Sequence, residues 1–148
     1  EGSEYNLFEY KKSKFGAMVC IESTYPDMSR NFVKKGADFL VYVANDGWYI
    51  DPPEAQQHAK QTILRAIETR KPVLRSGNTG ITWVVSPYGS ILKELEHNTA
   101  GMLVSNDMDI YSNNSKTLFV VAGNWLSYLS IFVTFCLILK GFIKRYRK

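Results

Sequence analysis

The stretch DFLVYVAND, residues 38–46, is a continuous run of apolar and β-branched side chains that stops at an Asn-Asp-Gly turn signal. Such a run is typical of a buried β-strand. The stretch PPEAQQHAKQTILRAIETRK, residues 52–71, follows it, with prolines at its start and apolar residues repeating along one helical face. Arg70 and Lys71 stand at its end, where cations complement the helix dipole. A buried strand followed by an amphipathic helix is the unit from which α/β folds are built.

The same kind of element continues on both sides of this unit. Upstream, KFGAMVC (residues 14–20) predicts a short buried strand, and Pro26 suits the first turn of a helix that Gly36 can end. Downstream, four further strands are expected, at residues 72–77, 81–87, 90–96 and 101–110. The predicted order is strand, helix, strand, helix and then strands in hairpin succession. This order indicates an α/β layered arrangement with helices covering one face of a sheet.

The composition fits one globular domain. The chain has 148 residues, of which 45% are hydrophobic and 22% charged, and this excludes wholesale disorder. The net charge of +4 does not indicate a nucleic-acid-binding surface, because five of the 18 basic residues lie within the last nine positions. The other 13 are outnumbered by 14 acidic residues, so the basic character belongs to a tail. We expect no nucleic-acid partner.

A membrane-spanning helix is predicted near the C-terminus. Residues 118–139, LFVVAGNWLSYLSIFVTFCLIL, are 22 consecutive residues without a formal charge. As a helix they would extend about 33 Å, against a bilayer core of about 30 Å. Trp125 and Tyr128 fit an interfacial position, and the basic cluster KRYRK marks the C-terminus as cytoplasmic, which places the rest of the chain outside the cytoplasm. The alternative is a buried core helix.

Small residues recur along one face of this segment, as in membrane helices that pack closely against neighbours; they are Gly123, Ser127, Ser130, Thr134 and Gly141. The first 14 residues lack the apolar segment of a signal peptide. We therefore expect an upstream portion, absent here, to supply the neighbouring helices. The predicted division is a domain over residues 1–112 and a transmembrane helix with a basic cytoplasmic tail over residues 113–148.

Cys20 is the principal candidate for chemistry. It stands at the carboxyl end of a predicted strand, where open α/β sheets place reactive groups. There it is either a small buried side chain or a nucleophile next to amides that can bind an oxyanion. Cys136 lies within the apolar segment, so a disulfide between Cys20 and Cys136 would have to connect the end of a strand to a residue inside the membrane. An unpaired Cys20 in an oxidising compartment favours a functional role.

Other polar residues give weaker signals. Glu22 is either an acid, base or orienting group for Cys20 or a solvated carboxylate. His58 has no partner at ligand spacing and is interpreted as a surface or capping histidine, so no metal or cofactor is expected. Trp48 and Tyr49 follow a turn at a strand end, and exposed aromatic side chains there suit an apolar or lipid ligand.

Five segments together resemble a known family. They are Cys20-Ile21-Glu22, ANDGWY (44–49), QQHAKQTILRAIETRKP (56–72), VLRSGNTGIT (73–82) and VVSPYGSI (84–91). In this order they are similar to the C-terminal half of the carbon–nitrogen hydrolase (nitrilase-like) domain, and in particular to its membrane-bound branch, the apolipoprotein N-acyltransferases. The resemblance covers residues 15–109. It implies a partial αββα nitrilase-like sandwich followed by one C-terminal transmembrane helix.

The resemblance also implies an activity. The family uses a glutamate base, a lysine and a cysteine nucleophile. In the membrane-bound branch the cysteine takes a fatty acyl chain from a glycerophospholipid as a thioester. The α-amino group of the diacylglyceryl-modified N-terminal cysteine of an apolipoprotein then accepts it. The implied location is the bacterial inner (plasma) membrane, with the soluble domain on the periplasmic or outer side.

Site residues are carried over by position. Cys20 matches the nucleophile, Glu22 the carboxylate that follows it, and the backbone N–H of Ile21 an oxyanion donor. Trp48, with Tyr49 beside it, matches an aromatic near the substrate. Further motif positions are expected to hold loops and helices around the site, namely Asn45, Arg65, Glu68, Asn78 and Thr79.

Two departures qualify this assignment. Ile21 stands where the family commonly has an aromatic residue. The family's glutamate base and lysine lie farther upstream of the cysteine than this chain extends. The chain alone is therefore expected to be nearly inactive, as part of a longer enzyme, half of a split protein or a remnant. The alternatives are a non-catalytic membrane-tethered fragment and a nitrilase-type amidase.

Overall fold

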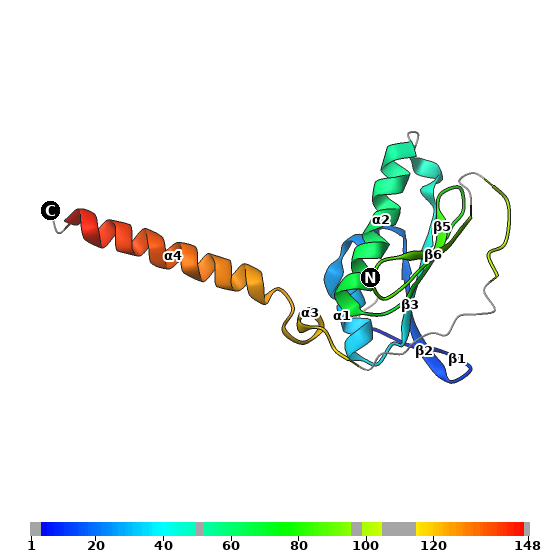
Figure 1. Ribbon diagram of the computed structural model, residues 1–148, viewed down its shortest axis with the longest axis horizontal. Helices are drawn as coiled ribbons and strands as arrows, with labels where there is room; N and C mark the ends of the chain where they lie inside the picture. The colour runs from blue at the N-terminus through cyan, green and yellow to red at the C-terminus, as the bar shows by residue number, and fades with distance from the viewer. Residues whose placement is uncertain (1–3, 50–51, 96–98, 105–114, 147–148) are drawn as a thin grey trace.

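The computed structural model describes residues 4–49, 52–95, 99–104 and 115–146, and within them a six-stranded sheet carries helices on one side (Figure 1). The strands lie side by side in chain order. Their bounds are β1 (Phe8–Tyr10), β2 (Ser13–Val19), β3 (Phe39–Ala44), β4 (Val73–Gly77), β5 (Thr82–Val85) and β6 (Ile91–Leu95).

The centre of the sheet is parallel and its two edges are antiparallel. Strands β2, β3 and β4 run in one direction, while β1, β5 and β6 each run antiparallel to the strand before or after them in the chain. Parallel neighbours need a crossover connection, and the helices α1 (Pro26–Lys34) and α2 (Pro52–Thr69) supply the two crossovers. The predicted order of elements is confirmed as far as β6. Strand β1 was not predicted; it folds back onto β2 through a turn at Lys11, whose φ is 54°.

The hydrophobic core lies between the sheet and the two helices, as predicted (Figure 1). Alternate residues of the strands point into it, and each fully buried aliphatic side chain contributes about 1.5–3 kcal/mol relative to exposure. The strands contribute Met18, Leu40, Tyr42, Val73 and Val85, and the helices Phe32, Val33, Ala59 and Ala66. This layer fixes the helices over one face of the sheet.

The opposite face of the sheet is also apolar. The rings of Phe8, Phe15 and Phe39 stack across three strands, with centroid separations of 5.4 and 5.1 Å. Val19 and Val43, on the same face, are 62% and 51% exposed. A second sheet packed here would complete the αββα sandwich, since sheets in sandwiches bury such faces against each other.

The last predicted strand is wrong over its described part. Residues 101–104 form no strand, and residues 105–110 lie outside the described residues. Met102 and Val104 are 82% and 56% exposed, so this segment has no buried face to hold it in the sheet. It is attached to β6 through Lys93, whose Nζ donates to the carbonyl of Val104 at 3.2 Å.

The predicted single helix over residues 118–139 is interrupted. A short helix, α3 (Leu118–Ala122), ends at Gly123, whose φ of 61° breaks the helical path. The side chain of Val120 is fully buried against the α/β core. The guanidinium of Arg30, from α1, donates to the carbonyls at the end of α3, those of Phe119, Val120 and Val121, at 3.0–3.2 Å. The first turn of the apolar segment therefore belongs to the α/β body.

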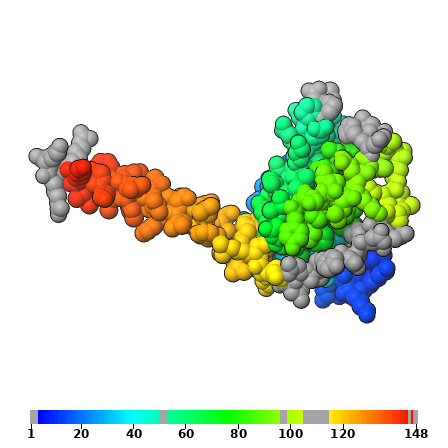
Figure 2. All heavy atoms as spheres, in the orientation of Figure 1, coloured from blue at the N-terminus to red at the C-terminus, as the bar shows by residue number. Residues whose placement is uncertain are grey.

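The helix α4 (Trp125–Tyr146) follows two residues after α3 and projects from the body (Figure 2). Its segment Trp125–Lys144 is long and apolar enough to cross a membrane, and none of it is buried within the protein. Four of the predicted small residues, Ser127, Ser130, Thr134 and Gly141, lie on α4, whereas Gly123 precedes it. The predicted boundary between residues 112 and 113 lies outside the described residues, and this division stays a prediction.

Candidate active site

Cys20 occupies a strained turn at the carboxyl end of β2. The strand ends at Val19, and the chain turns directly into the 3-10 helix η1 (Cys20–Thr24). The φ of Cys20 is 50°, in the left-handed region, where a residue other than glycine costs of order 1–3 kcal/mol. The thiol is half-buried and forms no disulfide; Cys136, on α4, is exposed and likewise unpaired. Such strain persists only where surrounding contacts hold the backbone in place.

Local hydrogen bonds hold part of this turn. The carboxylate of Glu22 turns back and accepts the N–H of Val19 at 2.7 Å. The hydroxyl of Thr24 donates to the carbonyl of Ile21 at 2.7 Å. The side chain of Ile21 itself is 53% exposed. The structure therefore gives Glu22 a contact with the backbone just before Cys20.

Arg65 connects η1 to the helix α2. Its buried guanidinium donates through Nη1 to the carbonyls of Ser23 and Thr24, both at 3.3 Å. It also pairs with Glu68, with Nε 2.8 Å from Oε2 and Nη2 3.0 Å from Oε1. Burial raises the pKa of Glu68, and the charge of Arg65 offsets part of this effect. Through these contacts Arg65 connects the turn that carries Cys20 to Glu68 on α2.

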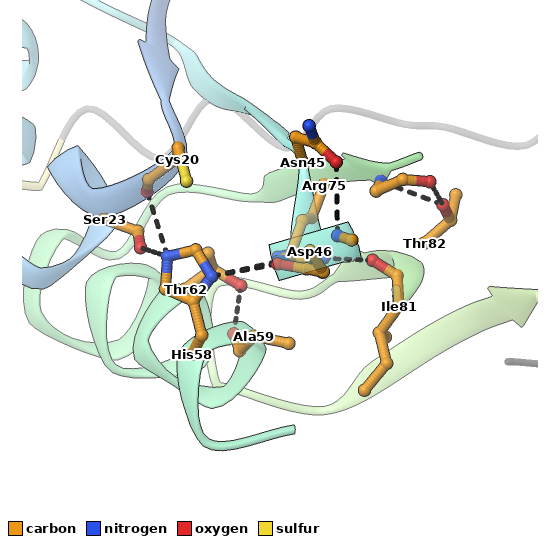
Figure 3. A network of polar contacts seen from close by, with 12 residues as sticks. Cys20, Ser23, Asn45, Asp46, His58, Ala59, Thr62, Arg75, Ile81 and Thr82 are labelled. Atoms are coloured by element: carbon orange, nitrogen blue, oxygen red, sulfur yellow. Dashed lines mark hydrogen bonds and ion pairs between the residues drawn. The ribbon is translucent and has the colours of Figure 1, made fainter. Parts of the chain in front are cut away.

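A buried ionic network lies on the other side of Cys20 (Figure 3). Asp46 follows β3, and its two carboxylate oxygens lie 2.9 and 2.7 Å from Nη2 of Arg75 on β4. Arg75 also donates through Nη1 to the carbonyl of Ile81. Nδ1 of His58, on α2, lies 3.0 Å from Oδ1 of Asp46. Nε2 of the same ring lies 3.1 Å from the carbonyl oxygen of Cys20 and 3.2 Å from Oγ of Ser23.

The interpretation of His58 as a surface or capping residue is therefore wrong. Its side chain is buried, and so are those of Asp46 and Arg75. The helix has turned His58 inward because it lies on the same face as Ala55, Ala59 and Thr62, all of which are buried. That spacing, together with an arginine inside an apolar strand, is the signal in the sequence that could have found this network.

The loop after β3 carries the two aromatic candidates. Asn45 accepts the N–H of Gly47 at 3.1 Å through Oδ1 and so caps the 3-10 helix η2 (Asp46–Trp48). Trp48 is 80% exposed. Tyr49 lies over the ring of His58, with centroids 5.7 Å apart. Burial, followed by the nearby charges of Cys20 and Asp46, raises the pKa of Tyr49, so Tyr49 faces the site and Trp48 faces solvent.

The loop after β4 packs against Asp46 and the loop after β3. The N–H of Asn78 donates to the carbonyl of Ala44 at 3.0 Å, which ties this loop to β3. Thr79 lies beside Gly47 of the preceding loop. Gly80 lies so close to the carboxylate of Asp46 that a Cβ atom there would overlap it. Within the described ranges, no three His, Cys, Asp or Glu side chains are placed to hold a metal ion.

The chain is similar to a family of enzymes and to acyltransferases within it. The carbon–nitrogen hydrolase family model matches residues 1–110. The apolipoprotein N-acyltransferase of Thermotoga maritima is 33% identical over 147 residues, which cover 99% of this chain and 28% of the relative. That of Bdellovibrio bacteriovorus is 39% identical over 114 residues, which cover 76% of this chain and 20% of the relative. The chain therefore spans about a quarter of the length of the curated relatives it matches.

Solved structures show the same fold. Saccharomyces cerevisiae Nit3, a member of branch 10 of the nitrilase superfamily, has a TM-score of 0.58 at 20% identity, over 67% of this chain and 39% of its own. An amidase from Nesterenkonia sp. has a TM-score of 0.57 at 19% identity, over 68% of this chain and 40% of its own. Because the family model matches residues 1–110, and the solved structures share the fold, the chain belongs to the carbon–nitrogen hydrolase family.

Proposed function

We propose that this chain is the nucleophile-bearing part of a lipoprotein N-acyltransferase. In this proposal Cys20 takes a fatty acyl chain from a glycerophospholipid and passes it to the N-terminal cysteine of an apolipoprotein. The observation that carries the proposal is the similarity of 99% of the chain to an apolipoprotein N-acyltransferase. The half-buried thiol on a strained turn at the carboxyl edge of a parallel sheet supports it.

The proposed chemistry is two successive displacements at one carbonyl carbon. The thiolate of Cys20 attacks the acyl ester of the phospholipid, the ester C–O bond breaks, and the lysophospholipid leaves after taking up a proton. The α-amino group of the acceptor cysteine then attacks the thioester. An amide bond forms, the amine loses a proton, and the thiolate is released. Each step passes through a tetrahedral oxyanion, for which we propose the backbone N–H of Ile21 as one donor.

The other site residues receive supporting roles in this proposal. Glu22 acts through its hydrogen bond to the N–H of Val19, by holding the turn that presents the thiol. Trp48, 80% exposed, and Tyr49 provide aromatic surface for the acyl chain. The remaining motif residues maintain the loops and α2 around the site, namely Asn45, Arg65, Glu68, Asn78 and Thr79.

The membrane and an upstream half-domain complete the proposed enzyme. We propose that α4 spans the bacterial inner membrane, with the catalytic body on the periplasmic side and the C-terminus in the cytoplasm. The upstream part would supply the glutamate base, the lysine and a second sheet for the apolar face that carries Val19 and Val43. One general base is worth about 10² to 10⁴-fold in rate, so we expect the chain alone to be nearly inactive.

The test is to trap the acyl-enzyme in the full-length gene product that contains this chain. The protein in detergent is incubated with a glycerophospholipid and digested, and the Cys20 peptide is weighed by mass spectrometry before and after hydroxylamine, which cleaves thioesters. We expect an acylated Cys20 peptide in the wild type and in Cys136→Ser, the matched control, and none in Cys20→Ala. Acyl-thioester in Cys20→Ala would contradict the proposal, and turnover of small amides without acylation by lipid would indicate an amidase.

A further inference from the structure

The buried network described above ends on the backbone of Cys20. From Arg75 it passes through the carboxylate of Asp46 to Nδ1 of His58, and from Nε2 of that ring to the carbonyl oxygen of Cys20 at 3.1 Å (Figure 3). The side chains of Asp46 and Arg75 are each 1% exposed and that of His58 is 4% exposed. Charged groups are retained at such depth only when they are paired, so the three side chains form one rigid unit.

The contacts of His58 engage both nitrogens of its ring with neighbouring groups. Nε2 faces the carbonyl oxygen of Cys20 and Oγ of Ser23, and Nδ1 faces Asp46. A carbonyl oxygen only accepts hydrogen bonds, so the contact with Cys20 requires a hydrogen on Nε2. Both nitrogens are therefore engaged in holding neighbours.

The carbonyl that His58 holds belongs to the strained residue. At φ 50° the backbone of Cys20 would relax toward an ordinary conformation if nothing fixed it. Relaxation would rotate the peptide that follows Cys20 and so redirect both the thiol and the N–H of Ile21. A displacement of about 1 Å at a reacting atom can cost about 10²-fold in rate.

We propose that His58 is the positioning residue for Cys20, with Asp46 and Arg75 fixing the imidazole so that Nε2 holds the Cys20 carbonyl. The catalytic consequence rests on the proposed function of Cys20 as the nucleophile. The structural part, that His58 maintains the turn, stands without it.

The experiment tests the contacts of the two ring nitrogens of His58 one at a time. The amide nitrogen of glutamine takes the place of Nε2, and that of asparagine takes the place of Nδ1. In the full-length gene product, we expect His58→Gln, which keeps the contact with Cys20 and loses the one with Asp46, to slow acylation of Cys20 from a glycerophospholipid less than His58→Asn does. We expect His58→Asn, which keeps the contact with Asp46 and loses the one with Cys20, to lower kcat about 10 to 100-fold without changing KM. Gln57→Asn, at the exposed neighbouring position, is the control.

A second readout does not depend on activity. Hydrogen exchange of the backbone amides in residues 20–25, followed by mass spectrometry, should be accelerated more in His58→Asn than in His58→Gln. Equal rates and equal exchange in the two variants, whether both normal or both impaired, would overturn the positioning role. Absence of a thioester in the wild type would refute the proposed acyl transfer instead, and the exchange measurement would then decide the role of His58 by itself.

Discussion

His58 and Arg65 lie seven residues apart on one buried face of α2, and both bind carbonyl oxygens of η1. His58 holds the first residue of the turn, Cys20, and Arg65 holds Ser23 and Thr24 near its end. Seven residues are about two helical turns, or about 10 Å along the axis. One straight helix therefore fixes both ends of the turn that presents the thiol, and any substitution that shifts α2 should displace Cys20.

Removing the cation at position 65 should destabilise the protein. Arg65→Met abolishes both carbonyl bonds and leaves the half-buried Glu68 without its partner, which for a buried pair costs about 3–5 kcal/mol. We expect a lower midpoint of thermal unfolding, measured by intrinsic fluorescence of the full-length protein. Glu68→Gln should restore part of the loss in the double variant. Lys60→Met, at an exposed position of the same helix, is the control; an equal midpoint in both single variants would contradict the expectation.

A side chain at position 80 should disrupt the ionic network. In Gly80→Ala the new Cβ overlaps the carboxylate of Asp46, so Asp46 must move away from His58 or Arg75. Overpacking of this kind typically costs about 1–3 kcal/mol. We expect both a lower unfolding midpoint and slower acylation of Cys20. The control is Gln56→Ala, at an exposed position of α2; wild-type behaviour of Gly80→Ala would show that Asp46 is not confined.

The buried hydroxyl of Tyr42 should make stability fall at high pH. Burial raises its pKa above the ordinary value of 10.0, and its hydrogen bond with Ser29 at 2.7 Å offsets part of the rise. Above about pH 10 the unfolded chain therefore loses a proton that the folded protein keeps, and the free energy of unfolding decreases as pH rises. At pH 7 we expect Tyr42→Phe to be less stable than the wild type by about 1 kcal/mol.

This difference should narrow and then reverse as pH rises from about 9 to about 11, because only the wild type carries the linked ionisation. Denaturant unfolding of both proteins across this range measures it, and the other tyrosines cancel in the comparison. A constant difference at all pH values would be inconsistent with a raised pKa of Tyr42.

Trp48 should affect the acyl donor and leave the fold intact. Its side chain is 80% exposed, so Trp48→Ala should leave the unfolding midpoint unchanged. If its ring contacts the lipid, KM for the glycerophospholipid should rise several-fold, since aromatic surface contributes to binding in proportion to the area it buries. Tyr88→Ala removes a ring that is 70% exposed, in the turn between β5 and β6, and should change neither quantity. Equal KM values in the two variants would remove Trp48 from the substrate site.

The sequence predicts those parts of the fold in which hydrophobic pattern and burial agree. The apolar run of β3, the proline at the start of α1 and the glycine after it lead directly to the observed elements. The place of Cys20 at the end of β2 follows from the same pattern. These predictions succeed because strands buried in a parallel sheet are apolar throughout.

The failures share a physical cause, which is that burial of a polar group depends on partners distant in sequence. His58 lies on the buried face of α2, but its partners Asp46, Arg75 and the Cys20 carbonyl lie on other elements, and the sequence of α2 alone does not reveal them. The break at Gly123 was missed for a related reason. A small residue in an apolar run equally suits a packed membrane helix and a helix end, and contacts with Arg30 distinguish the two.

The joint between α3 and α4 limits how far the body can travel from its anchor. Arg30 donates hydrogen bonds to the carbonyls at the end of α3. Only Gly123 and Asn124 separate α3 from α4, and fully extended they span about 7 Å. With α4 embedded in lipid, the body could neither swing outward nor search distant regions of the bilayer surface. Phospholipid donors would then reach the sulfur of Cys20 by their own lateral diffusion. A glycine-serine insert between α3 and α4 would let the body change its height above the membrane.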